Sequence, residues 1–480
     1  MEAATESQLP LAPRRMRTAL GVALPLAAGL GLRLFALQKL FEVNGDSLIY
    51  GGIAKNLLLH GSYALGPQNG QMSPTLIRLP GYPLLLAACF RFFGMENYFS
   101  ACCVGIALDL AGCLLLAAFA RRIVPQPYKT GAAAVTLWLA ALCPFTASYT
   151  AFPLTETPTL FMLAVALWSM ACFRDHPGWK NAIVFTFSVC GAALLRPDGA
   201  LVAVALAPAL VVGLPRGAIA PARLRVIACT CILLALAPFA IWAGRNWRTF
   251  HVFEPLAPRL AVDPGEDPNL GWERWVKTWC LDYISTYEIY WNVPGDSLDV
   301  NELPARAFDS PAQFAETADL ARDYNNDGMD LTPALDARFA RLAAERIAAH
   351  PLRYYLWLPL GRVADMWLRP RVENLPIDLD WWVYAHHNAE TRFSWGCAAL
   401  NAFYLLLAIA GLCLRPRFWL AMLAYMLLRS AMLLTVSAPE ARYTLECFPM
   451  MLALGGVAGY WFVDRVCRLV GKVKASFGRD

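Results

Sequence analysis

Apolar runs of about 20 residues recur along most of this chain, and each is followed by a short polar stretch. A run of that length matches one α-helix crossing the hydrocarbon core of a bilayer, about 30 Å thick. A shorter apolar run at 83–94 predicts a partly buried or interfacial helix. The pattern as a whole predicts an all-α polytopic membrane protein with about ten spans, at residues 16–37, 99–120, 130–149, 157–173, 181–195, 201–214, 226–243, 393–414, 418–436 and 444–463.

Basic residues at the ends of these runs predict the orientation. The N-terminal tail, residues 1–15, ends in Arg14 and Arg15, while Arg121 and Arg415 follow spans that return to the same side. Cytoplasmic loops carry an excess of Lys and Arg, so these positions are expected in the cytoplasm. Both termini, including the tail 465–480, then lie inside, and the polar loop 38–82 lies outside.

The polar segments divide the chain into parts. We expect an N-terminal membrane module at 16–245 and three further spans within 393–464. Between them lie a small extracytoplasmic insert, 246–350, and a segment at 351–392 that contains Arg362 and Asp365 among several Trp and Tyr residues. Because aromatic residues favour the membrane interface, this last segment is predicted to be interfacial or re-entrant.

Composition excludes an ordinary soluble protein. Only 16% of the 480 residues are charged, against about 25% in soluble domains, and the mean hydropathy is +0.43. Residues 251–350 hold 18 acidic and 8 basic residues, whereas the remainder holds 18 acidic and 33 basic ones. An acidic insert is therefore attached to a basic membrane body. The basic residues are dispersed at span ends, which argues against nucleic-acid binding.

Most of the 14 cysteines lie inside apolar runs, and no CxxC motif occurs. Their positions favour small buried side chains over a disulfide framework or a metal site. The first apolar run is long, and no small-residue cleavage site follows it, so we expect it to remain as an anchor.

The polar loop 38–82 contains a second pattern. Asp46 and Tyr50 are four residues apart, which places both side chains on one face of a helix. Gly61 is a helix-stop signal, after which we expect the chain to turn through Gly66–Pro67 and reach Arg78. A carboxylate-bearing helix just outside a span suggests a functional site.

The predicted topology collects further polar residues on the outer side. They mix acids, arginines and tyrosines, unlike the lone basic residues of the inner side. Charge beside hydrocarbon is costly, and acids gain nothing from the positive-inside bias, so a functional site is the first hypothesis. The outer set comprises Asp46, Tyr50, Arg78, Glu156, Arg196, Asp198, Arg245, Asn246, Arg442 and Tyr443.

Structural alternatives exist for several of these side chains. Arg196 and Arg245 can extend to lipid headgroups while their aliphatic stems stay in the membrane. Glu156 can cap the helix that follows it, and Asp46 stands at the start of its own predicted helix. For Asp46, a capping role and a role as catalytic base are compatible.

At these residues the sequence resembles a known family. The run Asp46-x3-Tyr50-x3-Ala54-x2-Leu57-x3-Gly61, followed by Arg78-Leu-Pro-Gly-Tyr-Pro83, is similar to the first outer loop of GT-C glycosyltransferases. The nearest groups are the protein O-mannosyltransferases and the bacterial aminoarabinose and lipopolysaccharide-sugar transferases. The later positions occur in the order those families use, and the resemblance covers the membrane body from Met16 to Val463.

The resemblance implies a GT-C-like helical bundle. It also implies transfer of a sugar from a polyprenyl-phosphate donor to a lipid, glycan or protein acceptor, at the outer face of a bacterial inner membrane. Asp46 would be the general base. Guanidinium groups would bind the donor phosphate, and other polar side chains would bind substrate. The implied phosphate ligands are Arg78, Arg196, Arg245 and Arg442, and the implied substrate ligands are Tyr50, Glu156, Asp198 and Tyr443.

Two positions depart from the family pattern. Ser47 follows Asp46 where protein mannosyltransferases carry an Asp-Glu pair, and Arg-Leu-Pro-Gly stands where many relatives have His-Pro-Pro. These departures leave the acceptor open, and with it the participation of a divalent metal.

A lipid or glycolipid flippase without transferase activity is the main alternative. Such a protein should carry ionisable residues near mid-span and broken helices at the midplane. Here most charges lie at span ends, with Arg33, Asp109 and Arg429 as partial exceptions.

Overall fold

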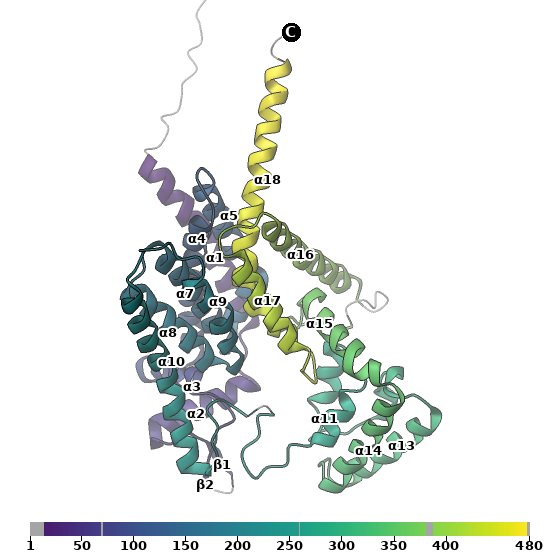
Figure 1. Ribbon diagram of the computed structural model, residues 1–480. Helices are drawn as coiled ribbons and strands as arrows, with labels where there is room; N and C mark the ends of the chain where they lie inside the picture. The colour runs from purple at the N-terminus through teal and green to yellow at the C-terminus, as the bar shows by residue number, and fades with distance from the viewer. Residues whose placement is uncertain (1–13, 69–70, 259, 381–386, 478–480) are drawn as a thin grey trace, which may run out of the picture.

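The computed structural model describes residues 14–68, 71–258, 260–380 and 387–477, and most of them are helical (Figure 1). Nearly all of the predicted tail 1–15 and part of the segment 351–392 lie outside these ranges. The first half contains α1 (Arg14–Leu40), α2 (Asp46–His60), β1 (Ala64–Gln68), β2 (Gln71–Pro74), α3 (Gly81–Phe93), α4 (Tyr98–Ile123), α5 (Lys129–Ala141), α6 (Pro144–Ser148), η1 (Tyr149–Ala151), α7 (Glu156–Asp175), α8 (Trp179–Leu195), η2 (Pro197–Gly199), α9 (Ala200–Val211) and α10 (Pro221–Phe250).

The second half begins with short elements and ends with long helices. In order these are α11 (Leu270–Val276), α12 (Tyr283–Ser285), η3 (Thr286–Tyr290), η4 (Val300–Glu302), η5 (Ala305–Ala307), α13 (Pro311–Asn326), α14 (Pro333–Ala349), η6 (Arg353–Trp357), α15 (Leu358–Leu368), α16 (Asn388–Cys413), α17 (Trp419–Leu433), η7 (Ala441–Cys447) and α18 (Phe448–Phe477).

The structure is that of an α-helical polytopic membrane protein, as predicted. All ten predicted spans coincide with a helix or a helix pair. Within the described residues, six helices are long and apolar enough to cross a membrane, and α5 with α6 and η1 forms a seventh candidate, bent by 46°. The other three, α8, α9 and α17, are shorter apolar helices, so length alone does not support ten spans.

Local sequence explains the main breaks. α5 ends before Pro144, which lacks the N–H needed to continue the helix and instead begins α6. α2 ends at Gly61, which adopts the left-handed conformation with φ 64° and donates its N–H to the Leu57 carbonyl. The expected turn at Gly66–Pro67 is wrong, because these residues lie in β1, which pairs with β2 as a small antiparallel hairpin.

The acidic insert has its own hydrophobic core. Trp275 and Trp279 are fully buried in one cluster with Phe339 of α14, and the Trp275 ring packs against both. α10 extends to Phe250, a few residues beyond the boundary expected from sequence. On α15, the buried Arg362 donates to the backbone carbonyls of Lys277 and Cys280, which joins this helix to the insert.

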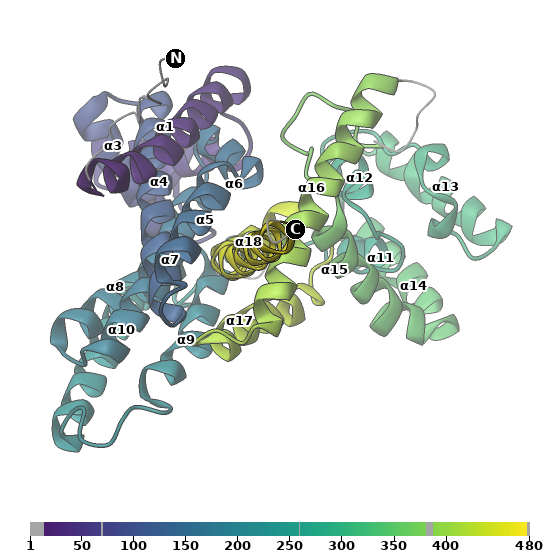
Figure 2. The ribbon, with the colours of Figure 1, turned by 90° about the horizontal axis from the view of Figure 1, so that it is seen from above.

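The start of α1 and the end of α18 lie at the opposite end of the molecule from α2. Figure 1 shows α2, α3 and the hairpin at one end, and the start of α1 and the end of α18 at the other. We call the first of these the α2 end. Seen from above, α18 lies between the N-terminal helices and α16, and it packs against both α5 and α16 (Figure 2). The arrangement brings η7, at the start of α18, close to the N-terminal half.

Candidate active site

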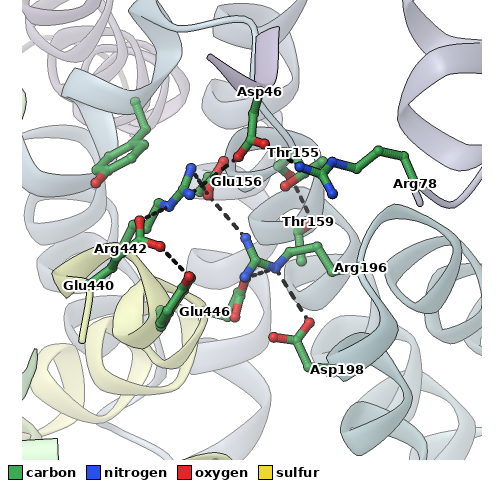
Figure 3. Close-up of polar contacts among 12 residues, drawn as sticks. Asp46, Arg78, Thr155, Glu156, Thr159, Arg196, Asp198, Glu440, Arg442 and Glu446 are labelled. Carbon is green, nitrogen blue, oxygen red and sulfur yellow. Dashed lines mark hydrogen bonds and ion pairs between the residues drawn. The ribbon is translucent and has the colours of Figure 1, made fainter. Parts of the chain in front are cut away.

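Several helix ends from distant parts of the sequence meet at the α2 end and bring charged side chains together (Figure 3). We call this group the charged cluster. Five carboxylates and four guanidinium groups belong to it, namely Asp46 of α2, Arg78 before α3, Glu156 of α7, Arg196 and Asp198 between α8 and α9, Arg429 of α17, and Glu440, Arg442 and Glu446 in or beside η7.

Asp46 is held by two arginines. Its Oδ1 accepts a hydrogen bond from Arg78 Nη2 at 2.6 Å, and its Oδ2 accepts one from Arg442 Nη2 at 3.3 Å. Burial alone would raise the pKa of Asp46, but the two guanidinium groups outweigh burial and hold that pKa below its ordinary value of 3.8. Asp46 is therefore ionised, and both of its oxygens are occupied.

Tyr50 faces the same arginine as Asp46, as its helical spacing predicts. The Arg78 guanidinium carbon lies 5.7 Å from the centre of the Tyr50 ring, and Tyr82 packs edge-on against that ring. Burial raises the pKa of Tyr50 to about 12, so its hydroxyl remains protonated. It can therefore donate a hydrogen bond.

Glu156 pairs with an arginine and does not cap its helix. Thr155 is the N-cap of α7, and the Glu156 Oε1 atom lies 3.0 Å from Arg196 Nη1 and 3.8 Å from Arg442 Nη1. The side chain is 1% exposed, and its Oε2 has no hydrogen-bond partner. An unpaired buried carboxylate oxygen is costly, which favours a ligand group at this position.

Arg196 does not extend to the lipid headgroups. Its Nε lies 3.0 Å from Glu446 Oε1 and 3.4 Å from Asp198 Oδ1, in addition to the Glu156 pair. Gly199 permits the turn that follows, because a Cβ there would lie 2.2 Å from the Ala192 carbonyl oxygen. The close packing of this turn against α8 fixes Arg196 and Asp198 side by side.

Arg429 lies in the buried, innermost part of the charged cluster. Its Nη1 lies 2.9 Å from Asp198 Oδ2, and it also pairs with Glu446. Its Nε donates to the Tyr443 carbonyl at 2.6 Å. The mid-span position that set Arg429 apart in the sequence is therefore explained by burial among ion-pair partners.

Arg442 is surrounded by carboxylates. Besides Asp46 and Glu156, its Nε lies 2.5 Å from Glu440 Oε2. The Tyr443 hydroxyl donates to the other oxygen of Glu440, and the Tyr443 ring lies 5.8 Å from the guanidinium carbons of both Arg196 and Arg442. Glu440 thus fixes the two residues of the predicted Arg442–Tyr443 pair.

The structure does not bring Arg245 into the charged cluster. Its guanidinium donates to the backbone carbonyls of Tyr63 and Thr75, each at 2.8 Å, and lies over the rings of Tyr63 and Trp242. The neighbouring Asn246 donates to the Glu254 carbonyl at 2.8 Å. Arg245 is placed to hold the β1–β2 region against α10.

Three residues of the charged cluster were missed by sequence reasoning: Arg429, Glu440 and Glu446. Glu440 and Glu446 flank Arg442 in the run PEARYTLE, where only the arginine and tyrosine were selected. Both acids lie within four positions of Arg442 in the sequence, and this proximity could have pointed to them. For Arg429, the cost of a charge within an apolar run was the signal.

One group of side chains outside the charged cluster has the composition of a metal site. Asp378, His387 and Glu390 place one ligand atom each within 4.8 Å of one another, and no other such group occurs in the described ranges. His387 Nε2 lies 3.3 Å from Asp378 Oδ2, and both side chains are more than half exposed. None of these three described side chains has a buried polar atom without a hydrogen-bond partner that would require an ion.

No protein-family model and no curated protein matches the sequence. The solved structures that are similar include the oligosaccharyltransferase AglB of Archaeoglobus fulgidus in complex with an inhibitory peptide and a dolichol-phosphate, with 12% identity and a TM-score of 0.49 over 96% of this chain. The chain spans about half of AglB, 52% of its length. ArnT of Cupriavidus metallidurans bound to undecaprenyl phosphate has 16% identity and a TM-score of 0.41 over 93% of this chain and 78% of ArnT.

At TM-scores below 0.5 these similarities assign no activity and no site residue to this chain.

Proposed function

We propose that this protein is a glycosyltransferase that moves a sugar from a polyprenyl-phosphate carrier to an acceptor hydroxyl, with Asp46 as the general base. The acceptor oxygen would attack the anomeric carbon of the sugar and lose its proton to Asp46. The bond between that carbon and the phosphate oxygen would break, and the carrier would leave as a polyprenyl phosphate with one additional negative charge. Guanidinium donors would stabilise that charge.

The placement of Asp46 between two accessible arginines carries this proposal. The side chains of Asp46, Arg78 and Arg442 are 27%, 19% and 21% exposed, whereas those of Glu156 and Glu446 are 1% exposed. A proton acceptor and phosphate ligands therefore lie side by side where a substrate can reach them.

Phosphate binding requires an exchange of partners at the arginines. Arg78 and Arg442 are both paired with Asp46. A phosphate that takes up their hydrogen bonds would release Asp46 from one or both, and the carboxylate would then be free to accept the acceptor proton. Arg196 is less exposed and paired with several carboxylates, which suits a role in fixing the site as well as binding phosphate.

The remaining predicted substrate residues fit different tasks. The unpaired Oε2 of Glu156 can accept a hydrogen bond from a sugar hydroxyl. Tyr50 can donate one, because its hydroxyl remains protonated. Asp198 pairs with Arg196 and Arg429, so we assign it to positioning those arginines. Tyr443 supports Arg442 through Glu440 and the contact of its ring.

The proposed setting is the extracytoplasmic face of a bacterial inner membrane. The donor would be a polyprenyl-phosphate sugar, which reaches the site from the surrounding lipid, and the acceptor a lipid, glycan or protein. The α2 end lies opposite the start of α1 and the end of α18 (Figure 1), which suits a site outside if both termini are inside.

The bend between α5 and α6 and the charges Arg33 and Asp109 are features that a flippase would share, but both charges are paired within the protein. Arg33 and Asp109 form a buried ion pair, with 2.6 Å between Nε and Oδ2, and Arg33 also donates to the Gly29 and Ala141 carbonyls. These contacts fix α1 against α4 and the end of α5. They satisfy both charges internally and leave none of them facing a transport path.

The test begins with the lipids that co-purify with the full-length protein. Mass spectrometry of an organic extract should detect a polyprenyl-phosphate sugar, which then serves as donor. The purified protein in lipid nanodiscs should convert this donor to polyprenyl phosphate when membrane extract supplies the acceptor. Asp46→Asn should abolish the conversion, whereas the exposed insert variant Glu316→Gln should retain it. A fully active Asp46→Asn variant, or no conversion by the unaltered protein, would reject the proposal.

A further inference from the structure

The guanidinium group of Arg442 lies among three carboxylates. Its three nitrogens each approach a different one, with Nε 2.5 Å from Glu440, Nη2 3.3 Å from Asp46 and Nη1 3.8 Å from Glu156. These carboxylates come from three elements, the start of α2, the start of α7 and the segment beside η7 (Figure 3). Among the residues that the structure describes, Arg442 is therefore the one group that joins all three.

Three converging carboxylates are a typical ligand set for a divalent cation such as Mg²⁺ or Mn²⁺. A metal ion would draw one oxygen from each to about 2.1 Å. Within the described part of the chain, however, the oxygens of Asp46, Glu156 and Glu440 do not form a group of potential ligands within 4.8 Å of one another. The planar guanidinium spans the wider gap between them.

The net charge of the charged cluster also favours a cation at the position of Arg442. Its five carboxylates and four guanidinium groups give a net charge of −1 when all are ionised. Without Arg442 the net charge would be −2, and a polyprenyl phosphate would add further negative charge. A permanent cation at this position is therefore needed for the carboxylates and the phosphate to occupy one site.

We propose that Arg442 is the fixed cation of this site, occupying the position among Asp46, Glu156 and Glu440 that a divalent metal ion would otherwise take. This inference rests on the proposed function for its chemistry: the charge that develops on the leaving phosphate is stabilised by Arg442, and the transfer requires no divalent metal. The guanidinium stays charged at every working pH.

Glu440 is the positioning residue for this cation. It is 5% exposed, its Oε2 forms an ion pair with Arg442 Nε, and its Oε1 accepts a hydrogen bond from the Tyr443 hydroxyl. Both oxygens are thus used within the protein. Glu440 holds the Nε edge of Arg442, and this leaves the Nη groups to change partner between Asp46 and phosphate.

The test measures Mn²⁺ binding by electron paramagnetic resonance of the free ion, on full-length protein in nanodiscs. All samples carry His387→Ala, because the exposed Asp378–His387–Glu390 group would otherwise contribute a signal. With Arg442 present we expect no Mn²⁺ bound at the charged cluster. Arg442→Ala should create a site for about one Mn²⁺ per chain, because the three carboxylates are then free to close on the ion.

A second substitution identifies the new site. Adding Glu440→Gln to Arg442→Ala should remove Mn²⁺ binding, and adding Glu316→Gln, an exposed acid on α13, should not. If Arg442→Ala does not yield folded protein, Arg442→Gln, which keeps most of the side-chain volume, is measured in its place. Failure of the arginine variant to bind Mn²⁺, or Mn²⁺ binding by the His387→Ala protein that Glu440→Gln removes, would overturn the proposal.

A separate measurement tests whether catalysis needs a metal ion, using the donor that co-purifies with the protein. Conversion by the protein with Arg442 present should be unchanged after EDTA treatment and transfer to metal-free buffer, and a loss restored by Mg²⁺ or Mn²⁺ would overturn the proposal. Because the Mn²⁺ measurement needs no turnover, it decides the role of Arg442 even if the protein proves not to be a transferase.

Discussion

Asp46 and Arg442 lie 396 positions apart in the chain, and their Oδ2 and Nη2 atoms lie 3.3 Å apart. The contact joins the start of α2 to η7 and completes a bridge in which Arg78 holds the other Asp46 oxygen. It also sets the chemistry of the proposed base. A carboxylate between two guanidinium groups has little affinity for a proton until a substrate draws those groups away.

Asp46→Asn is the most direct test of the proposed base. We expect the conversion of donor to polyprenyl phosphate to fall by about 10²–10⁴-fold, the usual contribution of a general base. Binding of undecaprenyl phosphate should be retained or strengthened, because Arg78 and Arg442 no longer pair with a competing carboxylate. Product formation and lipid binding are measured on the same nanodisc preparation.

The exposed acid Glu316 supplies the matched control, since Glu316→Gln makes the same kind of change outside the site. Loss of both activity and lipid binding in Asp46→Asn would indicate a structural role for the carboxylate, and full activity would remove it from the mechanism.

The pH dependence of kcat/KM should reveal how the arginines beside Asp46 affect its pKa. The pKa of Asp46 lies below 3.8 in the folded protein, so the base is ionised throughout the ordinary working range. Arg78→Gln removes one guanidinium and one hydrogen bond, and the pKa of Asp46 must therefore rise. We expect the acidic limb of the kcat/KM profile to move to higher pH in this variant. An unmoved limb would assign the proton to another group.

The same linkage affects stability. A carboxylate whose folded pKa is depressed stabilises the fold fully above its unfolded pKa, and this contribution is lost as the pH falls through the folded pKa. The Asp46 pairs should therefore contribute above about pH 4 and weaken in stronger acid. Arg78→Gln should narrow the difference in unfolding midpoint between neutral and acidic buffer.

Much of the fold was predictable because it follows from local patterns. The length of apolar runs located the helices, and the four-residue spacing of Asp46 and Tyr50 with the stop at Gly61 gave α2 with nearly its true bounds. The bend after α5 was not predicted. It depends on Pro144 together with Arg33, which donates to carbonyls at the end of α5 from a distant helix.

For the candidate site, the sequence predicted only on which side of the membrane and at what depth each residue lies. A residue at the outer end of a span is placed at the right depth, and this was enough to bring Asp46 and Arg442 into one group. Depth does not tell which way a side chain faces around the helix. Arg245 lies at the expected level, yet it points to the hairpin side of α10 and bonds to Tyr63 and Thr75.

Sequence reasoning also missed a charged site residue that is buried within an apolar run. Arg429 was set aside as an exception to the rule that charges lie at span ends. Its partners, Asp198 and Glu446, stand on elements that meet α17 only in the folded chain. Ion pairs between distant elements depend on helix packing, which periodicity does not encode.

Arg245 itself yields a prediction that separates structure from catalysis. Arg245→Ala removes three hydrogen bonds, to the Thr75 and Tyr63 carbonyls and to Asn246 Oδ1, and should lower the free energy of unfolding by about 2–4 kcal/mol. The midpoint of thermal unfolding should fall, and hydrogen exchange should rise at residues 62–68 and 71–76. The kcat of the remaining folded protein should change little. Arg248→Ala, an exposed arginine on the same helix, is the control and should change neither quantity.

A large loss of kcat in Arg245→Ala, with hydrogen exchange at these residues unchanged, would instead place Arg245 among the substrate ligands, as its sequence resemblance first implied.

The orientation of the α2 end can be decided by cysteine labelling from outside intact cells. Glu156 is buried, so exposed positions are needed, and Glu42 and Glu266 provide them near the α2 end. In a background without the native cysteines, Glu42→Cys and Glu266→Cys should react with a membrane-impermeant maleimide. Gln126→Cys and Arg415→Cys, in loops expected in the cytoplasm, should react only after permeabilisation. Labelling of Arg415→Cys from outside would reverse the topology, and the proposed site would then face the cytoplasm.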